Sequence, residues 1–170
     1  IQNFYSGVSG DEIFRDIYKK YETRLKENRL IDFDDMLSYT YELFKERPDI
    51  LALWQNKYKY ILIDEFQDIN RLQYEIIKML AAPQNNLFIV GDDDQSIYRF
   101  RGSKPEIMLG FEKDYPNAKR ILLDTNYRCG RYIVEASLNL ISHNRERFDK
   151  KIIAASKSKA PVTFADFENR

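Results

Sequence analysis

The sequence predicts an α/β protein in which helices cover a parallel β-sheet and a helical segment precedes the sheet. Two observations carry this prediction. Apolar, β-prone runs alternate with amphipathic helical patterns from residue 58 to residue 141, and this order is typical of parallel sheets. The runs at 61–63 and 87–90 are apolar throughout, as strands buried on both faces are.

The first expected helix covers residues 9–27. Its apolar side chains follow helical spacing, and Ser9 and Glu12 have the spacing of a capping box. The basic side chains of this helix lie mostly off the apolar stripe, which favours a solvated face over a nucleic-acid contact.

Asp32 is placed to cap the next helix, at 32–46. The acids at 32–35 therefore fit a helix cap that complements the helix dipole better than they fit a metal cluster. Pro48 ends this helix and can open a short one at 49–56.

The alternating part of the chain begins with a strand that leads into acids. Capping boxes at Asn70 and Ser103 mark the starts of two covering helices. The expected elements are strand 58–63, helix 70–80, strand 87–90, helix 103–111, strand 120–123 and helix 130–141. Residues 145–159 are basic without clear periodicity and are expected to form a connection, and 161–167 fits a strand of a different unit.

Composition limits the functional classes. The chain has 170 residues, enough for one domain or for one domain and part of another. Its 27 basic and 27 acidic residues neither require nor exclude nucleic acid. The single cysteine excludes an internal disulfide framework and favours a reducing compartment such as the cytoplasm. No apolar stretch approaches the roughly 18 residues of a membrane helix, so no membrane partner is expected.

Two acids follow the first predicted strand directly. Asp64 and Glu65 stand where the chain leaves the strand, and open α/β sheets place their chemistry at that end. Asp64 has a short carboxylate suited to a hard divalent cation, and Glu65 reaches further and can take a proton from an attacking water. Acids that merely cap the next helix are the alternative, but a buried strand followed by several polar residues favours chemistry.

The segment 91–102 follows the next strand and is expected to open beside these acids. It combines an amide with two aromatic and two basic side chains: Gln95, Tyr98, Phe100, Arg99 and Arg101. The amide can hydrogen-bond a terminal phosphate oxygen and a water, the rings can stack on unpaired bases, and the guanidinium groups can bind phosphates. A surface loop bounded by glycines, with its rings in the core, is the alternative.

Asn126, Tyr127 and Arg128 follow the third predicted strand. An aromatic ring there can stack on a nucleobase, and an arginine can neutralise a phosphoryl group during transfer. A structural salt bridge is the alternative for Arg128. Because neighbouring parallel strands end at the same edge of a sheet, the acids, Gln95 and Arg128 are expected to share one cleft.

In combination, residues 64–68, 91–102 and 126–128 resemble the motifs of the UvrD/Rep/PcrA-type superfamily 1 DNA helicases, in order and in spacing. The resemblance covers about residues 31–151. It implies a RecA-like (P-loop NTPase) parallel sheet, incomplete in this chain, within an ATP-driven translocase that moves on single-stranded DNA and unwinds duplex. The implied partners are single-stranded DNA, duplex junctions and the remaining motor domains of the parent chain.

The resemblance also implies domain boundaries. Residues 1–30 correspond to the end of a helical insertion, residues 31–144 to the C-terminal part of the first RecA-like motor domain, and residues 145–170 to the crossover and start of the second motor domain.

The resemblance implies roles in ATP hydrolysis for five residues. Asp64 would hold Mg²⁺ and Glu65 would activate the hydrolytic water. Gln95 would sense the terminal phosphate of ATP. Tyr127 would stack on adenine, and Arg128 would act as an arginine finger.

Single-stranded DNA would be contacted by Tyr98, Phe100 and Arg101. Phe100 stands where the family usually has tryptophan, which keeps a stacking ring but makes it smaller. Arg99 replaces a common glycine and Cys129 a common serine or threonine; none of these departures removes a catalytic group.

The large departure is the absence of a Gly-x-x-x-x-Gly-Lys-Ser/Thr phosphate loop from the 170 residues. The phosphate cradle and its lysine are therefore expected outside this segment, and the chain alone is expected to be catalytically inactive. The start at Ile1 without an initiator methionine agrees with an internal fragment of a longer helicase.

Two other functions remain open. In a metal-dependent nuclease, Asp64, Glu65 and the acids at 92–94 can gather two metals, although Gln95 and Arg128 then have no role. The other is a degenerate, non-enzymatic motor domain that binds DNA or protein. A helicase fused to a nuclease domain is a related option.

Overall fold

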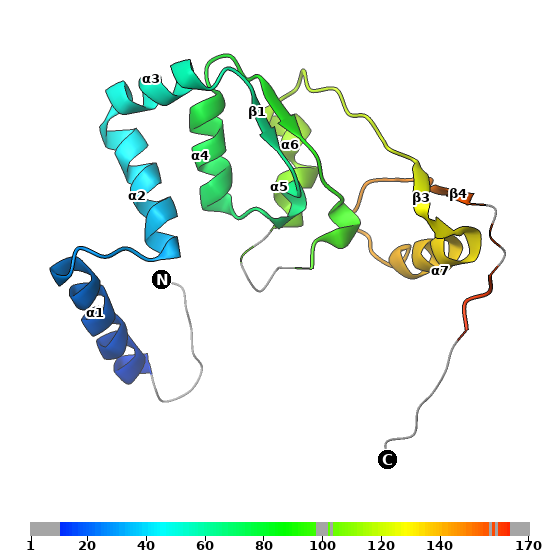
Figure 1. The fold of residues 1–170 in the computed structure, drawn as a ribbon, viewed down its shortest axis with the longest axis horizontal. Coiled ribbons are helices and arrows are strands. Elements are labelled where there is room, and N and C mark those ends of the chain that lie inside the picture. The colour runs from blue at the N-terminus through cyan, green and yellow to red at the C-terminus, as the bar shows by residue number, and fades with distance from the viewer. Residues whose placement is uncertain (1–10, 98–101, 103, 157, 159, 164–170) are drawn as a thin grey trace. The chain divides into compact units, whose positions relative to one another are not determined.

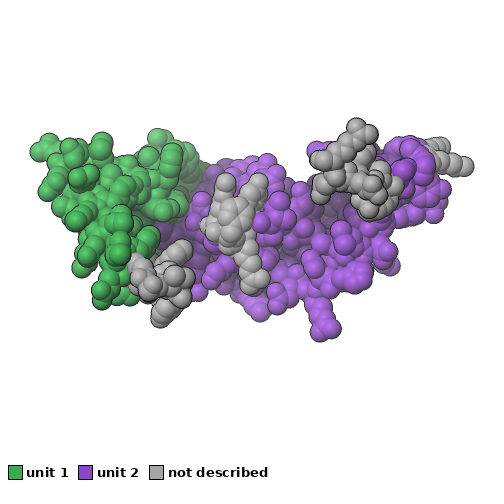
Figure 2. All heavy atoms as spheres, turned by 90° about the horizontal axis from the view of Figure 1, so that it is seen from below, with its two compact units in different colours: residues 1–59, 75–84 green, residues 60–74, 85–170 purple. Residues whose placement is uncertain are grey.

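The computed structural model describes residues 11–97, 102, 104–156, 158 and 160–163 (Figure 1). The chain divides into two compact units, residues 1–59 with 75–84 and residues 60–74 with 85–170 (Figure 2). Helices and short parallel strands are both present, which confirms the α/β class in its coarse form. The domain boundaries expected near residues 30 and 144 remain a prediction.

The first unit is helical. It contains α1 (Asp11–Glu27), α2 (Phe33–Glu46), α3 (Pro48–Lys57) and most of α4 (Arg71–Ala81). Its buried apolar side chains are Phe44, Ile76 and Ala81. Gln55 of α3 donates a hydrogen bond from Nε2 to the carbonyl of Met79 in α4 at 2.8 Å, so two of these helices are joined by a polar contact as well.

The predicted start of α2 is confirmed. Asp32 Oδ1 accepts a hydrogen bond from Asp35 N at 2.8 Å, and Asp35 Oδ2 accepts one from Asp32 N at 3.2 Å. This reciprocal pair is a capping box, so the acids at 32–35 cap a helix as expected. Pro48 occupies the first turn of α3, also as expected.

The second unit contains the first parallel strand pair. β1 (Ile61–Ile63) pairs with β2 (Leu87–Ile89), with Leu62 opposite Phe88. Leu62 and Phe88 are 70% and 57% exposed, so one face of this strand pair is not buried by the described residues. The expectation that these strands are buried on both faces is therefore wrong for one face. The short 3₁₀ turns η1 (Phe66–Asp68) and η2 (Asp93–Gln95) follow the two strands.

Phe66 is the centre of the core beside these strands. It is 1% exposed, and its ring packs edge-on against Tyr74 and Phe111, with ring centroids 5.8 and 5.6 Å away. Phe111 begins α6 (Phe111–Asp114), which follows α5 (Pro105–Leu109). The single helix expected at 103–111 is divided at Gly110, which ends α5. Because α5 contacts both η1 and η2, this core supports the polar turns after β1 and β2.

Asn70 and Gln73 form the predicted capping box at the start of α4. Asn70 N donates to Gln73 Oε1 at 2.8 Å, and Gln73 N donates to Asn70 Oδ1 at 2.9 Å. The capping box expected at Ser103 lies outside the described residues, as do Tyr98, Phe100 and Arg101.

The third predicted strand is wrong in position and in partner. Residues 120–123 form no strand, and the strand β3 is Thr125–Gly130. It pairs in parallel with β4 (Ile153–Ser156), inside the stretch that was expected to be a connection. Ile121 and Leu123 are 79% and 80% exposed. An apolar run suits a strand, but it forms one only where a neighbouring backbone completes its hydrogen bonds, and the described residues provide none at 120–123.

The described strands therefore form two separate two-stranded sheets instead of one larger sheet. Helix α7 (Arg131–Ile141) packs against β3 and β4, and it confirms the helix expected at 130–141. Residues 161–163 have no regular structure, and the rest of the strand expected there lies outside the described residues. None of the helices in the described part of the chain has the length and apolar character required to cross a membrane.

Candidate functional site

The chain turns sharply where β1 ends. Glu65 has the left-handed backbone conformation, with φ 51° and ψ 42°. For a residue with a side chain this conformation costs about 1 kcal/mol or more and is frequent at functional sites. Backbone hydrogen bonds hold the turn, because Val90 N donates to Ile63 O at 2.8 Å and Phe66 N donates to Val90 O at 2.9 Å.

Gln67 connects the turn after β1 with the turn after β2. Its side chain is almost fully buried, at 2% exposure. Its Nε2 donates to Glu65 Oε2 at 2.7 Å, and its Oε1 accepts from Asp92 N at 3.0 Å. The backbone carbonyl of Gln67 accepts a hydrogen bond from Ser96 Oγ at 3.2 Å. One buried amide therefore orients the Glu65 carboxylate and fixes the backbone that carries Gln95.

Gly91 makes room for this amide. A Cβ atom at position 91 would lie 2.6 Å from Gln67 Oε1 and 3.2 Å from both Gln67 N and Met108 Sδ. The first of these distances is well inside van der Waals contact, so a side chain at 91 displaces the Gln67 side chain.

Gln95 is held by Asp92. Its Nε2 donates to Asp92 Oδ2 at 2.7 Å, and a carboxylate can only accept, so the amide nitrogen must face Asp92. The Oε1 atom of Gln95 is then left as an acceptor on an exposed side chain.

Glu65 and Gln95 line the same open cavity, which has a volume of about 490 Å³. The other lining residues are Gln67, Asp68, Asp94 and Ile97. Asp68 Oδ1 is buried and has no hydrogen-bond donor among the described residues. The structure thus brings together the predicted base and the predicted phosphate sensor.

Asp64 is exposed at the same strand end. Its Oδ1 accepts from Glu65 N at 2.9 Å, and no contact within the described part of the chain occupies Oδ2. A carboxylate with one oxygen held in place and one available suits Mg²⁺, which binds to one or two carboxylates and keeps several waters. The geometry of Asp64 therefore fits its predicted role as a Mg²⁺ ligand.

The acids at 92–94 are neutralised by two cations from the segment after α7. Lys150 Nζ lies 2.6 Å from Asp92 Oδ1, 2.5 Å from Asp93 Oδ1 and 2.9 Å from Asp94 Oδ2. Arg147 binds Asp94 through two parallel hydrogen bonds of 2.8 and 2.7 Å. The three carboxylates offer oxygen atoms close enough together for a metal ion, but the Lys150 ammonium takes that position.

These contacts displace several pKa values. Burial alone would raise the pKa of Asp92, but hydrogen bonds from Lys150 and Gln95 outweigh it and lower that pKa. The pKa of Asp94 is lowered, chiefly by the hydrogen bonds from Arg147. Burial opposes the charge of Lys150, yet the three carboxylates raise its pKa overall. Asp92, Asp94 and Lys150 are therefore charged around neutral pH.

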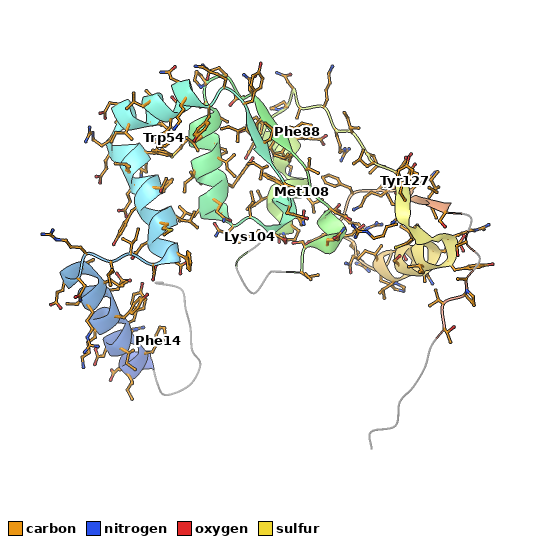
Figure 3. All side chains as sticks on the ribbon, in the orientation of Figure 1. Phe14, Trp54, Phe88, Lys104, Met108 and Tyr127 are labelled. Atoms are coloured by element: carbon orange, nitrogen blue, oxygen red, sulfur yellow. The ribbon has the colours of Figure 1, made fainter. Side chains whose placement is uncertain are left out.

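Tyr127 and Arg128 lie on β3, in the other sheet. Tyr127 is 83% exposed (Figure 3), and Arg128 is exposed too. The turn around them is local, because Asn126 Oδ1 accepts from Arg128 N at 2.9 Å and from Cys129 N at 2.8 Å. The expectation of a single sheet margin for all three motifs is wrong, since β3 pairs with β4 and with neither β1 nor β2.

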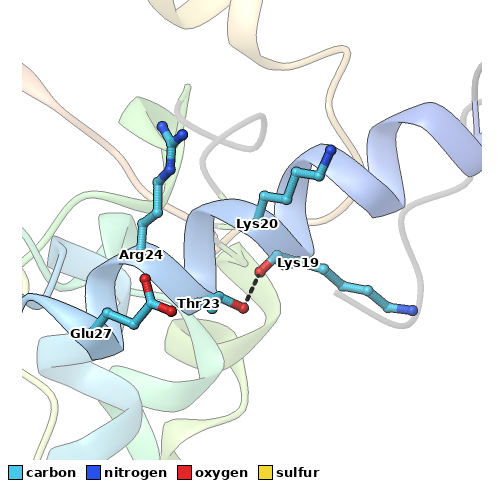
Figure 4. Close-up of a pocket in the computed structure, with 5 residues that line it drawn as sticks. All are labelled: Lys19, Lys20, Thr23, Arg24 and Glu27. Carbon is cyan, nitrogen blue, oxygen red and sulfur yellow. Dashed lines mark hydrogen bonds between the residues drawn. The ribbon is translucent and has the colours of Figure 1, made fainter.

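A second shallow cavity, of about 280 Å³, lies on α1 (Figure 4). It is lined by Lys19, Lys20, Thr23, Arg24 and Glu27. These side chains are exposed, and the hydrogen bond drawn there joins Thr23 Oγ1 to the carbonyl of Lys19 at 2.8 Å. This geometry agrees with the solvated face expected for the helix.

No positioning role was expected from the sequence for four residues: Gln67, Asp92, Arg147 and Lys150. Gln67 had a usable signal, because an amide between the acids of a turn can bridge them. The contacts from Arg147 and Lys150 reach acids 53 to 58 residues earlier in the chain, and nothing local in the sequence marks such a pairing.

Comparisons with known proteins identify the family. The family model of the UvrD/REP helicase N-terminal domain matches residues 2–116. The putative ATP-dependent DNA helicase YjcD of Bacillus subtilis is 50% identical over 158 residues, which are 92% of this chain and 21% of that protein. The ATP-dependent DNA helicase PcrA of the same organism is 44% identical over 151 residues, 87% of this chain and 20% of PcrA.

PcrA of Leuconostoc citreum is 41% identical over 153 residues, 90% of this chain and 20% of that protein. The chain thus spans about a fifth of the length of these curated relatives. Because the family model matches more than half of its residues, the chain belongs to the UvrD/REP helicase N-terminal domain family.

Proposed function

We propose that the chain is part of the motor of an ATP-dependent DNA helicase, with a RecA-like sheet that the parent protein completes. The observation that carries this proposal is the shared cavity of Glu65 and Gln95, joined through Gln67 and Asp92. A carboxylate and an amide that face one cavity at the ends of parallel strands fit the hydrolysis of a nucleotide.

Glu65 acts as the general base in this proposal. The hydrogen bond from Gln67 Nε2 to Oε2 orients the carboxylate and leaves Oε1 to take a proton from a water in the cavity. Gln95 offers its Oε1 to the same water, because its Nε2 is bound to Asp92. The two side chains thus hold one water from two directions.

Asp64 is the proposed Mg²⁺ ligand, since one of its oxygens is fixed by Glu65 N and the other is available. When bound, Mg²⁺ would neutralise charge on the phosphates of ATP. Tyr127 is exposed enough to stack on adenine, and Arg128 enough to meet a phosphate. The phosphate loop, and the groups that bring these two residues to the cavity, belong to the parent protein in this proposal.

Single-stranded DNA and duplex junctions are the proposed substrates. Support comes from the relatives, which are named ATP-dependent DNA helicases, and from the residues Tyr98, Phe100 and Arg101, which carry stacking and basic groups directly after Gln95.

The nuclease alternative loses support from the structure. A two-metal site would need the acids at 92–94, but Lys150 and Arg147 already bind them. Asp64 and Glu65 would remain for a single metal. Incubation of the full-length protein with Mn²⁺ and labelled DNA separates the two: cleavage that is lost in Asp64→Ala would favour the nuclease.

ATP hydrolysis by the full-length protein that contains this chain tests the proposal. Glu65→Gln removes the base and keeps the size of the side chain, so we expect DNA-stimulated ATP hydrolysis to fall by about 100- to 10,000-fold while ATP still binds. Glu135→Gln is the matched control, because Glu135 is an exposed residue of α7 paired only with Arg131 among the described residues. Unchanged hydrolysis in Glu65→Gln would refute the assignment.

A further inference from the structure

We infer that Lys150 is a positioning residue for Gln95 and acts on it through Asp92. This inference rests on the proposed function, because it concerns the side chain proposed to hold the attacking water. It adds a residue from outside the three motifs and from a segment that had been expected only to connect two parts of the chain.

The contact geometry supports a directed link. The two oxygens of Asp92 are divided between two sets of partners: Oδ1 accepts from Lys150 Nζ at 2.6 Å and from Asp94 N at 3.1 Å, and Oδ2 accepts from Gln95 Nε2 at 2.7 Å. Fixing Oδ1 sets the plane of the carboxylate and therefore the position of Oδ2. Lys150, together with Asp94 N, thus sets where the Gln95 amide nitrogen is held.

Burial of Lys150 supports this link. The side chain of Lys150 is 8% exposed, and those of its partners Asp92, Asp93 and Asp94 are 42%, 2% and 17% exposed. Ion pairs that are shielded from water are screened little by salt, and removing one partner leaves the other charge uncompensated. Lys150 is also the only described cation that contacts all three acids, whereas Arg147 contacts Asp94 alone among them.

The link has a chemical consequence for Gln95. An amide can present either its oxygen or its nitrogen to a ligand. With Nε2 bound to Asp92, the oxygen is the group presented to the cavity, so Gln95 accepts a hydrogen bond from a donor such as water. Without Lys150, Asp92 Oδ1 keeps only the longer hydrogen bond from Asp94 N, so the carboxylate that selects this orientation of Gln95 is held less firmly.

The position of Lys150 in the chain gives the link a second role. Lys150 lies three residues before Ile153, where β4 begins and pairs with Thr125 of β3. The same short segment therefore contacts the acids before Gln95 and leads into the sheet that carries Tyr127 and Arg128. A displacement of that segment would be transmitted to the Gln95 amide through Asp92.

A first experiment measures the orientation of Gln95 without any catalysis. The side-chain amide of Gln95 is observed by ¹⁵N NMR in this chain and assigned by its loss in Gln95→Glu. In Lys150→Met we expect the amide resonance to move and its protons to exchange with water several-fold faster. Lys151→Met is the matched control, because Lys151 is an exposed neighbouring lysine with no hydrogen bond or ion pair to the described residues. Equal spectra for Gln95 in the two lysine variants would overturn the inference.

A second experiment uses ATP hydrolysis by the full-length protein in a double-mutant cycle. Lys150→Met and Asp92→Asn are each expected to lower kcat by about 10- to 100-fold, with little change in KM for ATP, because a misplaced catalytic group costs rate more than binding. If Lys150 acts through Asp92, the double variant is no slower than Asp92→Asn. Lys150→Arg keeps the charge and is expected to recover part of kcat. Additive losses, or no recovery in a folded Lys150→Arg, would overturn the inference.

The two experiments separate the inference from the proposed function. If the unaltered full-length protein does not hydrolyse ATP, the proposed function fails, and the NMR comparison still decides whether Lys150 orients Gln95. If Lys150→Met does not fold, Asp92→Asn and Lys150→Arg give the same NMR test with less change in charge burial.

Discussion

The turns after β1 and β2 differ in kind from the turn in β3. Glu65 and Gln95 are held by the side chains of Gln67 and Asp92. These two holding residues are in turn fixed by contacts from distant parts of the chain, because Gln67 accepts from Asp92 N and Asp92 binds Lys150. Around Tyr127 and Arg128, the backbone is held by the side chain of the neighbouring Asn126 and by the pairing of β3 with β4, and Tyr127 is 83% exposed.

The two regions therefore differ in whether their side chains are fixed before a ligand binds. In the proposed function, the groups that would hold the water, Glu65 and Gln95, are pre-organised by hydrogen bonds. The groups proposed to bind the base and phosphates of a nucleotide, Tyr127 and Arg128, are exposed, and a ligand or another domain would bring them into place. Substitutions in the first region should therefore affect folding and rate together, and substitutions in the second should affect binding alone.

The largest effect is expected from Gly91→Ala. The added Cβ would lie 2.6 Å from Gln67 Oε1 and close to Met108, so we expect a loss of about 3 kcal/mol in the free energy of unfolding, measured by urea denaturation of this chain. Gly130→Ala is the control in the second region, because its Cβ would meet Ser158 at an ordinary 3.5 Å. Equal losses in the two variants would contradict the comparison.

Gln67→Leu should have the next largest effect. It keeps the volume but leaves Asp92 N without its acceptor and Glu65 without its donor, and we expect a cost of about 2 kcal/mol in the same measurement. In the full-length protein kcat should fall as well, because Glu65 loses its orientation. Gln84→Leu, at an exposed position, is the control; a stable and active Gln67→Leu would show that the buried amide does not organise the site.

A smaller effect is expected from acidification. The pKa of Asp94 is lowered from its ordinary 3.8, chiefly by hydrogen bonds from Arg147. A lowered pKa contributes stability above the unfolded value, and this contribution is lost as the pH falls from about 3.8 through the folded pKa. The urea midpoint should therefore drop less between neutral and acidic pH in Arg147→Met than in the unaltered chain. Identical pH profiles would show that the Arg147–Asp94 pair does not contribute to the pH dependence of stability.

Tyr127→Ala should have the smallest effect on folding. Because the ring is exposed, the unfolding free energy should change by less than about 0.5 kcal/mol. In the full-length protein, however, a ring that stacks on adenine should be needed for tight ATP binding, which a fluorescent ATP analogue measures. Tyr132→Ala, an exposed tyrosine of α7, should leave binding unchanged; a Tyr127→Ala protein that binds ATP normally would remove the stacking role.

The sequence was informative wherever local chemistry determines structure. Asp32 and Asn70 begin helices because a short polar side chain satisfies the free N–H groups of a first turn, and such a cap is visible in four consecutive letters. The apolar runs predicted the strands β1 and β2, and the parallel pairing of these strands explains why Glu65 and Gln95 line one cavity.

The sequence was misleading where structure depends on a distant partner. The run at 120–123 is as apolar as β1 but has no neighbouring strand among the described residues, whereas Ile153–Ser156 looked like a connection and pairs with β3. Lys150 looked like one basic residue among many, and only the folded chain shows that it sits among three carboxylates.

The uncovered pair Leu62 and Phe88 has a practical consequence at the bench. These two large apolar side chains lie opposite each other across the strand pair and are exposed to solvent. They should bind hydrophobic dyes such as ANS and cause concentration-dependent aggregation during purification. A lysine introduced at either position should lessen the dye signal and make concentrated samples easier to handle.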